Sequence, residues 1–266
     1  MSLTLSASLF ASAWAAFLLG PLLVGRRRWA VRNPTLALHA WALLFVAGAV
    51  GAFFGLVLVL RSAAEVTREI GSGQPLTACQ TCHAAAVYGA SWLMTAAVVT
   101  ALCVAAYGWS GSLLHQRRIR RATRGAAAGL PGQLVDGVRL SLLPSEAYVA
   151  ACTPGRRSRV VVTTALLSLL DEEELRSVVA HESAHLRLGH RLLLGVAELQ
   201  SRCLAGLPCA AEARRSLALL AELAADDRAA RRCGPAVTAS ALAKVAEASG
   251  DEAMRLRARR TSLAAA

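Results

Sequence analysis

The chain has 266 residues, of which 55% are hydrophobic, and its mean hydropathy is +0.46. This composition is too apolar for an ordinary soluble domain of this length, so it predicts a membrane protein. The formal charge of +12 comes almost wholly from arginine, because Lys244 is the only lysine. A basic balance of this kind indicates either nucleic acid or the anionic face of a membrane as a partner.

Three apolar segments in the first 110 residues are each long enough to cross a lipid bilayer, which takes about 20 residues. The first is too long and wrongly flanked for a cleaved signal peptide, since arginines follow it and none precedes it. We therefore predict a membrane domain over residues 1–110 with three transmembrane helices, at about 3–24, 35–60 and 84–109.

The arginines between these segments predict the orientation. Four lie between the first two segments and five follow the third, whereas the loop over 61–83 has two arginines offset by two glutamates. By the positive-inside rule, the N-terminus and this loop face outward, and the chain after about residue 112 is cytosolic. Much of the basic charge is thus a topology signal, and no direct nucleic-acid binding is expected.

The expected extracytoplasmic loop contains the sequence CQTCH, with Cys79, Cys82 and His83. The C-x-x-C-H spacing is that of covalent haem c attachment, and disulfides also persist on the outer side of a membrane. The loop is short and offers no partner methionine or second histidine. It therefore favours a Cys79–Cys82 disulfide or thiol pair over the alternatives, which are a metal site, haem or no role.

A basic linker over 111–133 is expected to lead into a globular domain over 134–266. Two strands, at about 146–152 and 158–163, flank the Pro-Gly turn residues between them. The second is expected to be an edge strand to which a substrate peptide could add. A short helix over 165–170 follows.

Asp171 and Glu174 have the spacing of a capping box, which predicts the start of a helix running through His190. The tail over residues 255–266 is expected to be frayed. Three further helices are predicted, at about 192–207, 211–232 and 236–249.

The helix that begins at Asp171 carries His181, Glu182 and His185 in the pattern H-E-x-x-H. Residues four apart share a helix face, so both histidines can point a ring nitrogen at one ion while Glu182 reaches a water beside it. This spacing is typical of zinc hydrolases, which need a third protein ligand. His190 falls on the far side of such a helix and is expected to be a surface or capping histidine.

Glu222 and Asp226, on a later helix, offer the missing ligand. Glu222 can bind the ion, and Asp226, one turn further along the same face, can hold a ligand histidine by its second nitrogen. The other interpretation is that residues 222–228 form a solvated helix face. Together the two motifs favour one zinc ion per chain.

With these motifs, the chain resembles the membrane-embedded zinc metallopeptidases of the beta-lactam-sensor and antirepressor type, and more distantly the heat-shock and prenyl-protein membrane endopeptidases. The matching stretches are "SRVVVTTALLSLLDEEELRSVVAHESAHLRLGH" and "ELAADDRAARR". The resemblance implies a gluzincin site, with Glu182 as the catalytic base and Asp226 behind a ligand. The implied zinc ligands are His181, His185 and Glu222.

The resemblance also implies a mainly α membrane protein of the bacterial cell membrane, with a cytosolic α+β zincin-like domain and a small sheet. The expected function is zinc-dependent cleavage of a protein or peptide substrate, with a transcriptional repressor as one candidate. A further donor usually helps the oxyanion, and Arg228, Arg231 and Arg232 are candidates.

The sensor members have a fourth span and a penicillin-binding domain after the protease, and this sequence shows neither, so beta-lactam sensing is not expected. The alternative function is a non-catalytic membrane sensor or redox protein that uses the CQTCH motif.

Overall fold

The computed structural model describes residues 5, 7–16, 28–73, 75, 77–127, 132–135, 138–153, 159–203 and 208–263. Within these residues the protein is mainly helical, with one small mixed sheet. The chain divides into two compact units. The first holds most of residues 1–110 together with 197–216, and the second holds mainly 111–196 and 217–266.

Long apolar helices dominate the first unit, where the short α2 (Arg28–Arg32) precedes α3 (Pro34–Gly71) and α4 (Ala78–Ala127). Among the described residues, α3 and the 78–100 part of α4 are long and apolar enough to cross a membrane. These two segments coincide with the second and third predicted spans. Of the first predicted span, residues 7–16 form a shorter apolar helix, and the remainder lies mostly outside the described residues.

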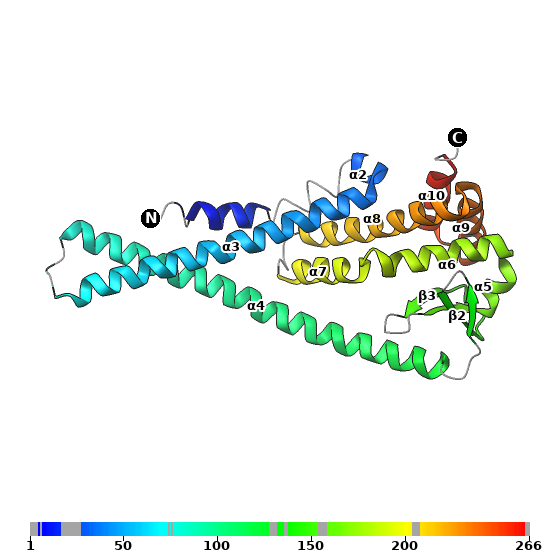
Figure 1. The fold of residues 1–266 in the computed structure, drawn as a ribbon, viewed down its shortest axis with the longest axis horizontal. Coiled ribbons are helices and arrows are strands. Elements are labelled where there is room, and N and C mark those ends of the chain that lie inside the picture. Colours follow the sequence, from blue (N-terminus) through cyan, green and yellow to red (C-terminus); the bar gives the residue numbers. More distant parts are fainter. Residues whose placement is uncertain are drawn as a thin grey trace. The chain divides into compact units, whose positions relative to one another are not determined.

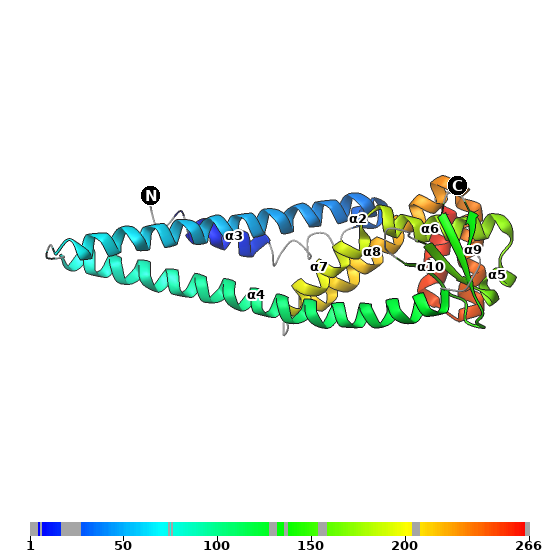
Figure 2. The same cartoon turned by 60° about the horizontal axis from the view of Figure 1, so that its bottom comes forward.

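The predicted loop over 61–83 is mostly helical. Near the end of α3 and the start of α4 the two helices pack together through Val66, Ala84 and Val87, and they diverge further along (Figure 1 and Figure 2). In the same region the hydroxyls of Thr67 and Tyr88 lie 2.6 Å apart. The apolar run ends near residue 60, but the backbone hydrogen bonds of a helix do not depend on apolar side chains, so α3 continues.

The CQTCH motif therefore lies on the first turns of α4. Thr77 and Gln80 cap this helix reciprocally, because the Thr77 N–H donates to Gln80 Oε1 (2.9 Å) and the Gln80 N–H donates to Thr77 Oγ1 (3.3 Å). Cys79 and Cys82 are exposed free thiols. Their pairing in a disulfide stays a prediction, as does a role for His83.

The expected linker is also largely helical, since residues 111–127 continue α4 without a break. This segment is rich in arginine and alanine, which have high helix propensity. The positive charge of the expected basic linker does not prevent a helix.

The second unit contains a four-stranded sheet. Its strands are β1 (Gly132–Val135), β2 (Val138–Leu143), β3 (Ala150–Thr153) and β4 (Arg159–Thr163), in the order β1-β2-β4-β3. β4 pairs in parallel with β2 and antiparallel with β3.

The expectation that residues 158–163 form an edge strand is wrong, because β4 is central. Its three consecutive valines are all buried, which suits a strand covered on both faces. β3 is instead an edge of the sheet formed by the described strands. β1 and β2 were not anticipated.

Helices pack around this sheet. α6 lies between the sheet and α9, with β3 and β4 on one side (Figure 1). One apolar core joins the sheet to α5, α6 and α9, and it fixes α6 in place; it consists of Leu140, Val160, Val162, Leu166, Leu170, Val179, Ala241 and Val245. The helices of this part of the chain are α5 (Thr164–Leu169), α6 (Glu172–Arg187), α7 (His190–Cys203), α8 (Pro208–Cys233), α9 (Pro235–Ser249) and α10 (Glu252–Leu263).

The two ends of α6 differ in how well the sequence predicted them. The capping box is confirmed, since the Glu174 N–H donates to Asp171 Oδ1 (2.9 Å) and the Asp171 N–H donates to Glu174 Oε2 (3.0 Å). The helix does not run through His190, however. It ends at Arg187, and Gly189 takes a left-handed conformation (φ +65°) that glycine adopts without strain, so a new helix begins at His190.

The described part of the tail, residues 255–263, is not frayed, because it belongs to α10. Asp251 accepts hydrogen bonds from the backbone N–H groups of Ala253 (2.9 Å) and Met254 (3.2 Å), which caps the start of α10. The helix then packs closely against α9. A segment expected to be loose thus becomes part of the second unit.

Glu174 makes the stability of the second unit depend on pH. Its buried carboxylate accepts hydrogen bonds from Ser240 Oγ (2.7 Å) and Lys244 Nζ (2.6 Å) as well as from the Asp171 N–H. Burial acts to raise the pKa of Glu174, but these hydrogen bonds outweigh it and hold the pKa below its ordinary value of 4.5. A carboxyl whose pKa is depressed on folding stabilises the fold above its unfolded pKa, and that contribution is lost as pH falls through the folded pKa.

We therefore expect Glu174→Gln to lower the melting temperature at pH 7, with a difference from wild type that shrinks below about pH 4.5. The melting temperature of the detergent-solubilised chain is measured between pH 3 and pH 7, at intervals of about half a pH unit, because a single group titrates over a narrow pH range. Glu172→Gln is the matched control, because Glu172 is exposed on the same helical turn. An equal difference at every pH would contradict the assignment.

Candidate metal centre

Three side chains that can hold one metal ion meet between α6 and α8: His181, His185 and Glu222. The Nε2 atoms of the two histidines lie 3.1 Å apart. One carboxylate oxygen of Glu222 is 3.4 Å from Nε2 of His181, and the other is 3.5 Å from Nε2 of His185. Tetrahedral zinc with ligands at about 2.0–2.2 Å requires donor separations of about 3.3–3.6 Å. The two separations from Glu222 lie in this range and the histidine pair, at 3.1 Å, lies just below it, so the three donors are close to the arrangement that zinc needs.

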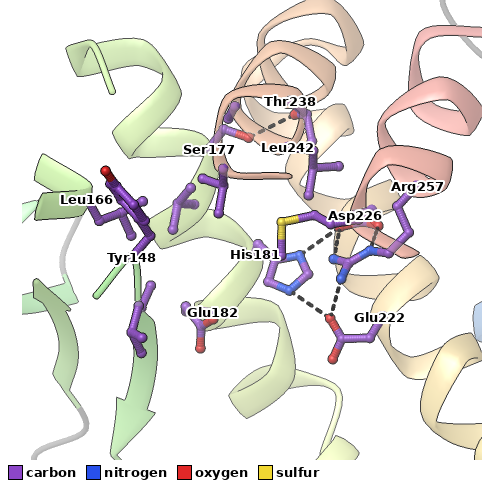
Figure 3. A pocket seen from close by; sticks show the side chains of 16 residues that line it. Tyr148, Leu166, Ser177, His181, Glu182, Glu222, Asp226, Thr238, Leu242 and Arg257 are labelled. Carbon is purple, nitrogen blue, oxygen red and sulfur yellow. Dashed lines mark hydrogen bonds and ion pairs between the residues drawn. The ribbon is translucent and has the colours of Figure 1, made fainter. Parts of the chain in front are cut away.

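Asp226 holds His181 from behind. The Nδ1–H group of His181 donates to Asp226 Oδ1 at 2.9 Å, and the carboxylate is 1% exposed. With Nδ1 committed to Asp226, the Nε2 lone pair of the neutral imidazole faces the other two donors. The predicted spacing of Glu222 and Asp226, one helical turn apart, thus brings both carboxylates to the same histidine (Figure 3).

Arg257 joins the two carboxylates. Its Nε and Nη2 atoms donate to Asp226 at 2.8 and 2.7 Å, and Nη1 lies 3.0 Å from Glu222 Oε2 (Figure 3). A planar guanidinium bound in this bidentate way fixes the orientation of its partners. Sequence reasoning missed Arg257, because it belongs to α10, in the tail expected to be frayed.

The three arginines proposed as oxyanion donors, Arg228, Arg231 and Arg232, do not line the cavity at this site, whereas Arg257 does. The signal that could have revealed it was local. Asp251 follows the glycine that stops α9, and the residues after it are good helix formers, which together indicate a new helix.

The charges of the centre support one another. Burial acts to lower the pKa of His181, but hydrogen bonds to Asp226 and Glu222 outweigh it and raise the pKa to about 9. Burial acts to raise the pKa of Asp226, but hydrogen bonds with Arg257 and His181 bring it down to about 2. Asp226 is therefore an ionised acceptor across the physiological range, and a metal ion must displace a proton from His181 in order to bind.

His190 is buried, and the expectation of a surface histidine is wrong. It is 1% exposed, and its Nδ1 atom lies 3.0 Å from Nδ1 of His185. The turn at Gly189 causes this, because it ends α6 and brings the first residue of α7 back against the preceding turn. Both histidines of the centre thus have a partner on the ring nitrogen that faces away from Glu222.

Glu182 lies beside the three donors without being one of them. Its carboxylate interacts with the backbone N–H and the thiol of Cys152, in the edge strand β3. Burial raises the pKa of Glu182, and burial together with Glu182 raises the pKa of the Cys152 thiol to about 11. The edge strand next to the centre is therefore β3. The sequence had led us to expect β4 in this position.

Comparison with known proteins identifies the matching family. The model of peptidase family M48 matches residues 114–251, which is 138 of the 266 residues and just over half of the chain. The match includes the whole of α6 and the part of α8 that carries Glu222 and Asp226, and it ends before Arg257. No curated protein and no solved structure matched the chain.

Proposed function

The chain belongs to peptidase family M48, which makes it a zinc metallopeptidase, and from this premise we propose that it is an integral membrane endopeptidase acting on protein substrates at the cytosolic side. The observation that carries the proposal is the donor triangle of His181, His185 and Glu222, whose donor atoms lie 3.1–3.5 Å apart, close to the separations that zinc needs. The sensor and antirepressor subtype stays a prediction, and so does cleavage of a repressor.

In this proposal the triangle holds one zinc ion, and other residues keep its donors in place. Asp226 supports His181, and His190 supports His185, as the partners of ligand histidines commonly do. Arg257 compensates the charge of both carboxylates and keeps Glu222 turned toward the histidines.

Zinc bound there supplies polarisation of the scissile carbonyl and lowers the pKa of a water molecule. Glu182 accepts the proton of the attacking water and passes it to the leaving amine. The contact with Cys152 holds the Glu182 carboxylate beside the donor triangle. Glu182 is suited to this role because no zinc ligand position depends on it.

Removing the metal should abolish cleavage. The purified full-length chain, loaded with zinc, should cleave unfolded casein, and a chelator such as 1,10-phenanthroline should stop the reaction until zinc is added back. Gel electrophoresis with mass spectrometry of the products measures this. Cleavage that survives full removal of zinc, checked by elemental analysis, would refute the proposed function.

The membrane location rests on α3 and α4 and on the arginines that flank the apolar segments. In intact cells, a membrane-impermeant thiol reagent should label the exposed Cys79 and Cys82. A cysteine introduced at the exposed position Glu247 (Glu247→Cys) should be labelled only after permeabilisation. The Cys79→Ser, Cys82→Ser double variant is the control, and labelling of Glu247→Cys in intact cells would reverse the orientation.

A further inference from the structure

The metal centre occupies one end of a cavity of about 220 Å³, and the other end is apolar. Figure 3 shows three of the apolar side chains, Tyr148, Leu166 and Leu242, on the side of His181 away from Glu222. A cavity of about 150 Å³ accommodates a benzene ring, so there is room for a large side chain even though part of the volume lies over the donor triangle. The apolar wall consists of Tyr148, Leu166, Val178, Leu242, Val245 and Met254.

The closed end of the cavity has two hydroxyls, and they are bonded internally. Ser177 and Thr238 are 2% and 3% exposed. Ser177 Oγ donates to Thr238 Oγ1 at 2.9 Å, and Thr238 Oγ1 donates to the carbonyl of Gly234 at 3.0 Å (Figure 3 shows the first of these). A charged group that entered this end would lose its hydration and gain no ion partner from the residues that line it.

The charged lining residues all lie at the metal end. Arg257 binds both Asp226 and Glu222 there, and Glu182 follows His181 in α6. The cavity thus joins a polar end, where a peptide bond would react, to an apolar end a short distance away along α6. Ser177 and His181, four residues apart on α6, mark the two ends.

From this arrangement we infer that the apolar end is a specificity pocket, which selects proteins with a large apolar residue, such as leucine, methionine or phenylalanine, next to the bond that is cleaved. This inference rests on the proposed function and adds a substrate class to it. Leu242 of α9 and Met254 of α10, two half-buried residues of the wall, determine the selectivity. A single methylene in an apolar pocket changes kcat/KM by about 10–200-fold.

The experiment uses the full-length, zinc-loaded chain in detergent. Mass spectrometry of digested casein first gives the cleavage sites, which should share a large apolar residue on one constant side of the bond. A peptide with leucine at this position is then compared with peptides that carry alanine, aspartate or tryptophan there. Wild type should cleave the alanine peptide at least about 10-fold less efficiently than the leucine peptide, and the aspartate peptide less efficiently still.

Variants at position 242 should change this preference in opposite directions. Leu242→Ala widens the pocket and should raise the tryptophan-to-leucine ratio of kcat/KM by about 10-fold, whereas Leu242→Trp fills it and should favour the alanine peptide. Met254→Ala provides a second widening variant if a change at position 242 impairs folding. Leu256→Ala is the control, since Leu256 is exposed on α10 and lies outside the cavity lining.

Two failures can be told apart. If wild type cleaves casein without preference, or if the variants at Leu242 and Met254 keep the wild-type ratios, the pocket inference is wrong and the endopeptidase function stands. If zinc-loaded wild type cleaves neither casein nor any peptide, the proposed function itself is wrong, and the pocket inference is overturned with it.

Discussion

The Glu182→Ala protein should bind one zinc ion per chain, melt close to the wild-type temperature, and cleave casein about 10²–10⁴-fold more slowly than wild type. The zinc content should not change, because Glu182 lies outside the triangle of His181, His185 and Glu222. The rate should fall because no other carboxylate of the cavity is available as a base. Glu222 and Asp226 are both bound to Arg257 and to His181.

Stability should change little, because two effects oppose each other. Removing a buried carboxylate, whose pKa is raised by that burial, relieves its desolvation cost, whereas the Cys152 N–H loses the acceptor that Glu182 provides. Glu173→Ala is the control, since Glu173 is exposed near the start of the same helix. Wild-type cleavage by Glu182→Ala would show that the base lies elsewhere.

The predictable features of the centre are the residue pairs that lie on one face of a single helix. His181 and His185 are four residues apart, and so are Glu222 and Asp226, and a helix places such pairs on one face wherever it lies in the fold. That the two faces meet depends on the packing of α6 against its neighbours. The spacing indicated the candidate donors, and the structure brings their atoms to 3.1–3.5 Å from one another.

His190 and Arg257 show why the other residues of the centre could not be predicted from the sequence. The position of His190 was inferred from a continuous helix, and the turn at Gly189 reverses that inference within two residues. Arg257 lies in the arginine-rich tail that was expected to be frayed. Its charge is compensated by Asp226 and Glu222, which are more than 30 residues away in the chain and come close to Arg257 only in the folded protein.

The prediction that β4 is an edge strand was wrong for a related reason. The three valines of β4 suit a buried strand, but which strands lie on either side of it is decided by pairings with β2 and β3. Its parallel partner, β2, was not anticipated, and without a second neighbour β4 was expected to be an edge. Long-range pairing of this kind leaves no periodic signal in either strand alone.

His185→Ala should abolish stoichiometric zinc binding. The substitution leaves two protein donors, His181 and Glu222, where a zinc site needs three. His190→Phe should have an intermediate effect, because His185 keeps its Nε2 donor but loses the partner at Nδ1 that fixes its ring. Loss of such a supporting partner typically lowers metal affinity by about 10–100-fold.

The measurements are elemental analysis of the purified proteins and competition with a fluorescent zinc chelator, and they order the variants by affinity. Wild type should bind most tightly, His190→Phe and Asp226→Asn should be weaker, and His185→Ala should retain no stoichiometric zinc. The stabilisation that zinc confers on the folded chain should fall in the same order, since a ligand stabilises the state that binds it in proportion to the logarithm of its affinity. His83→Ala, at an exposed histidine of α4, is the control. One zinc ion retained by His185→Ala would show that the donor triangle is not the metal site, and wild-type affinity in His190→Phe would show that the buried imidazole fills space behind His185 without orienting it.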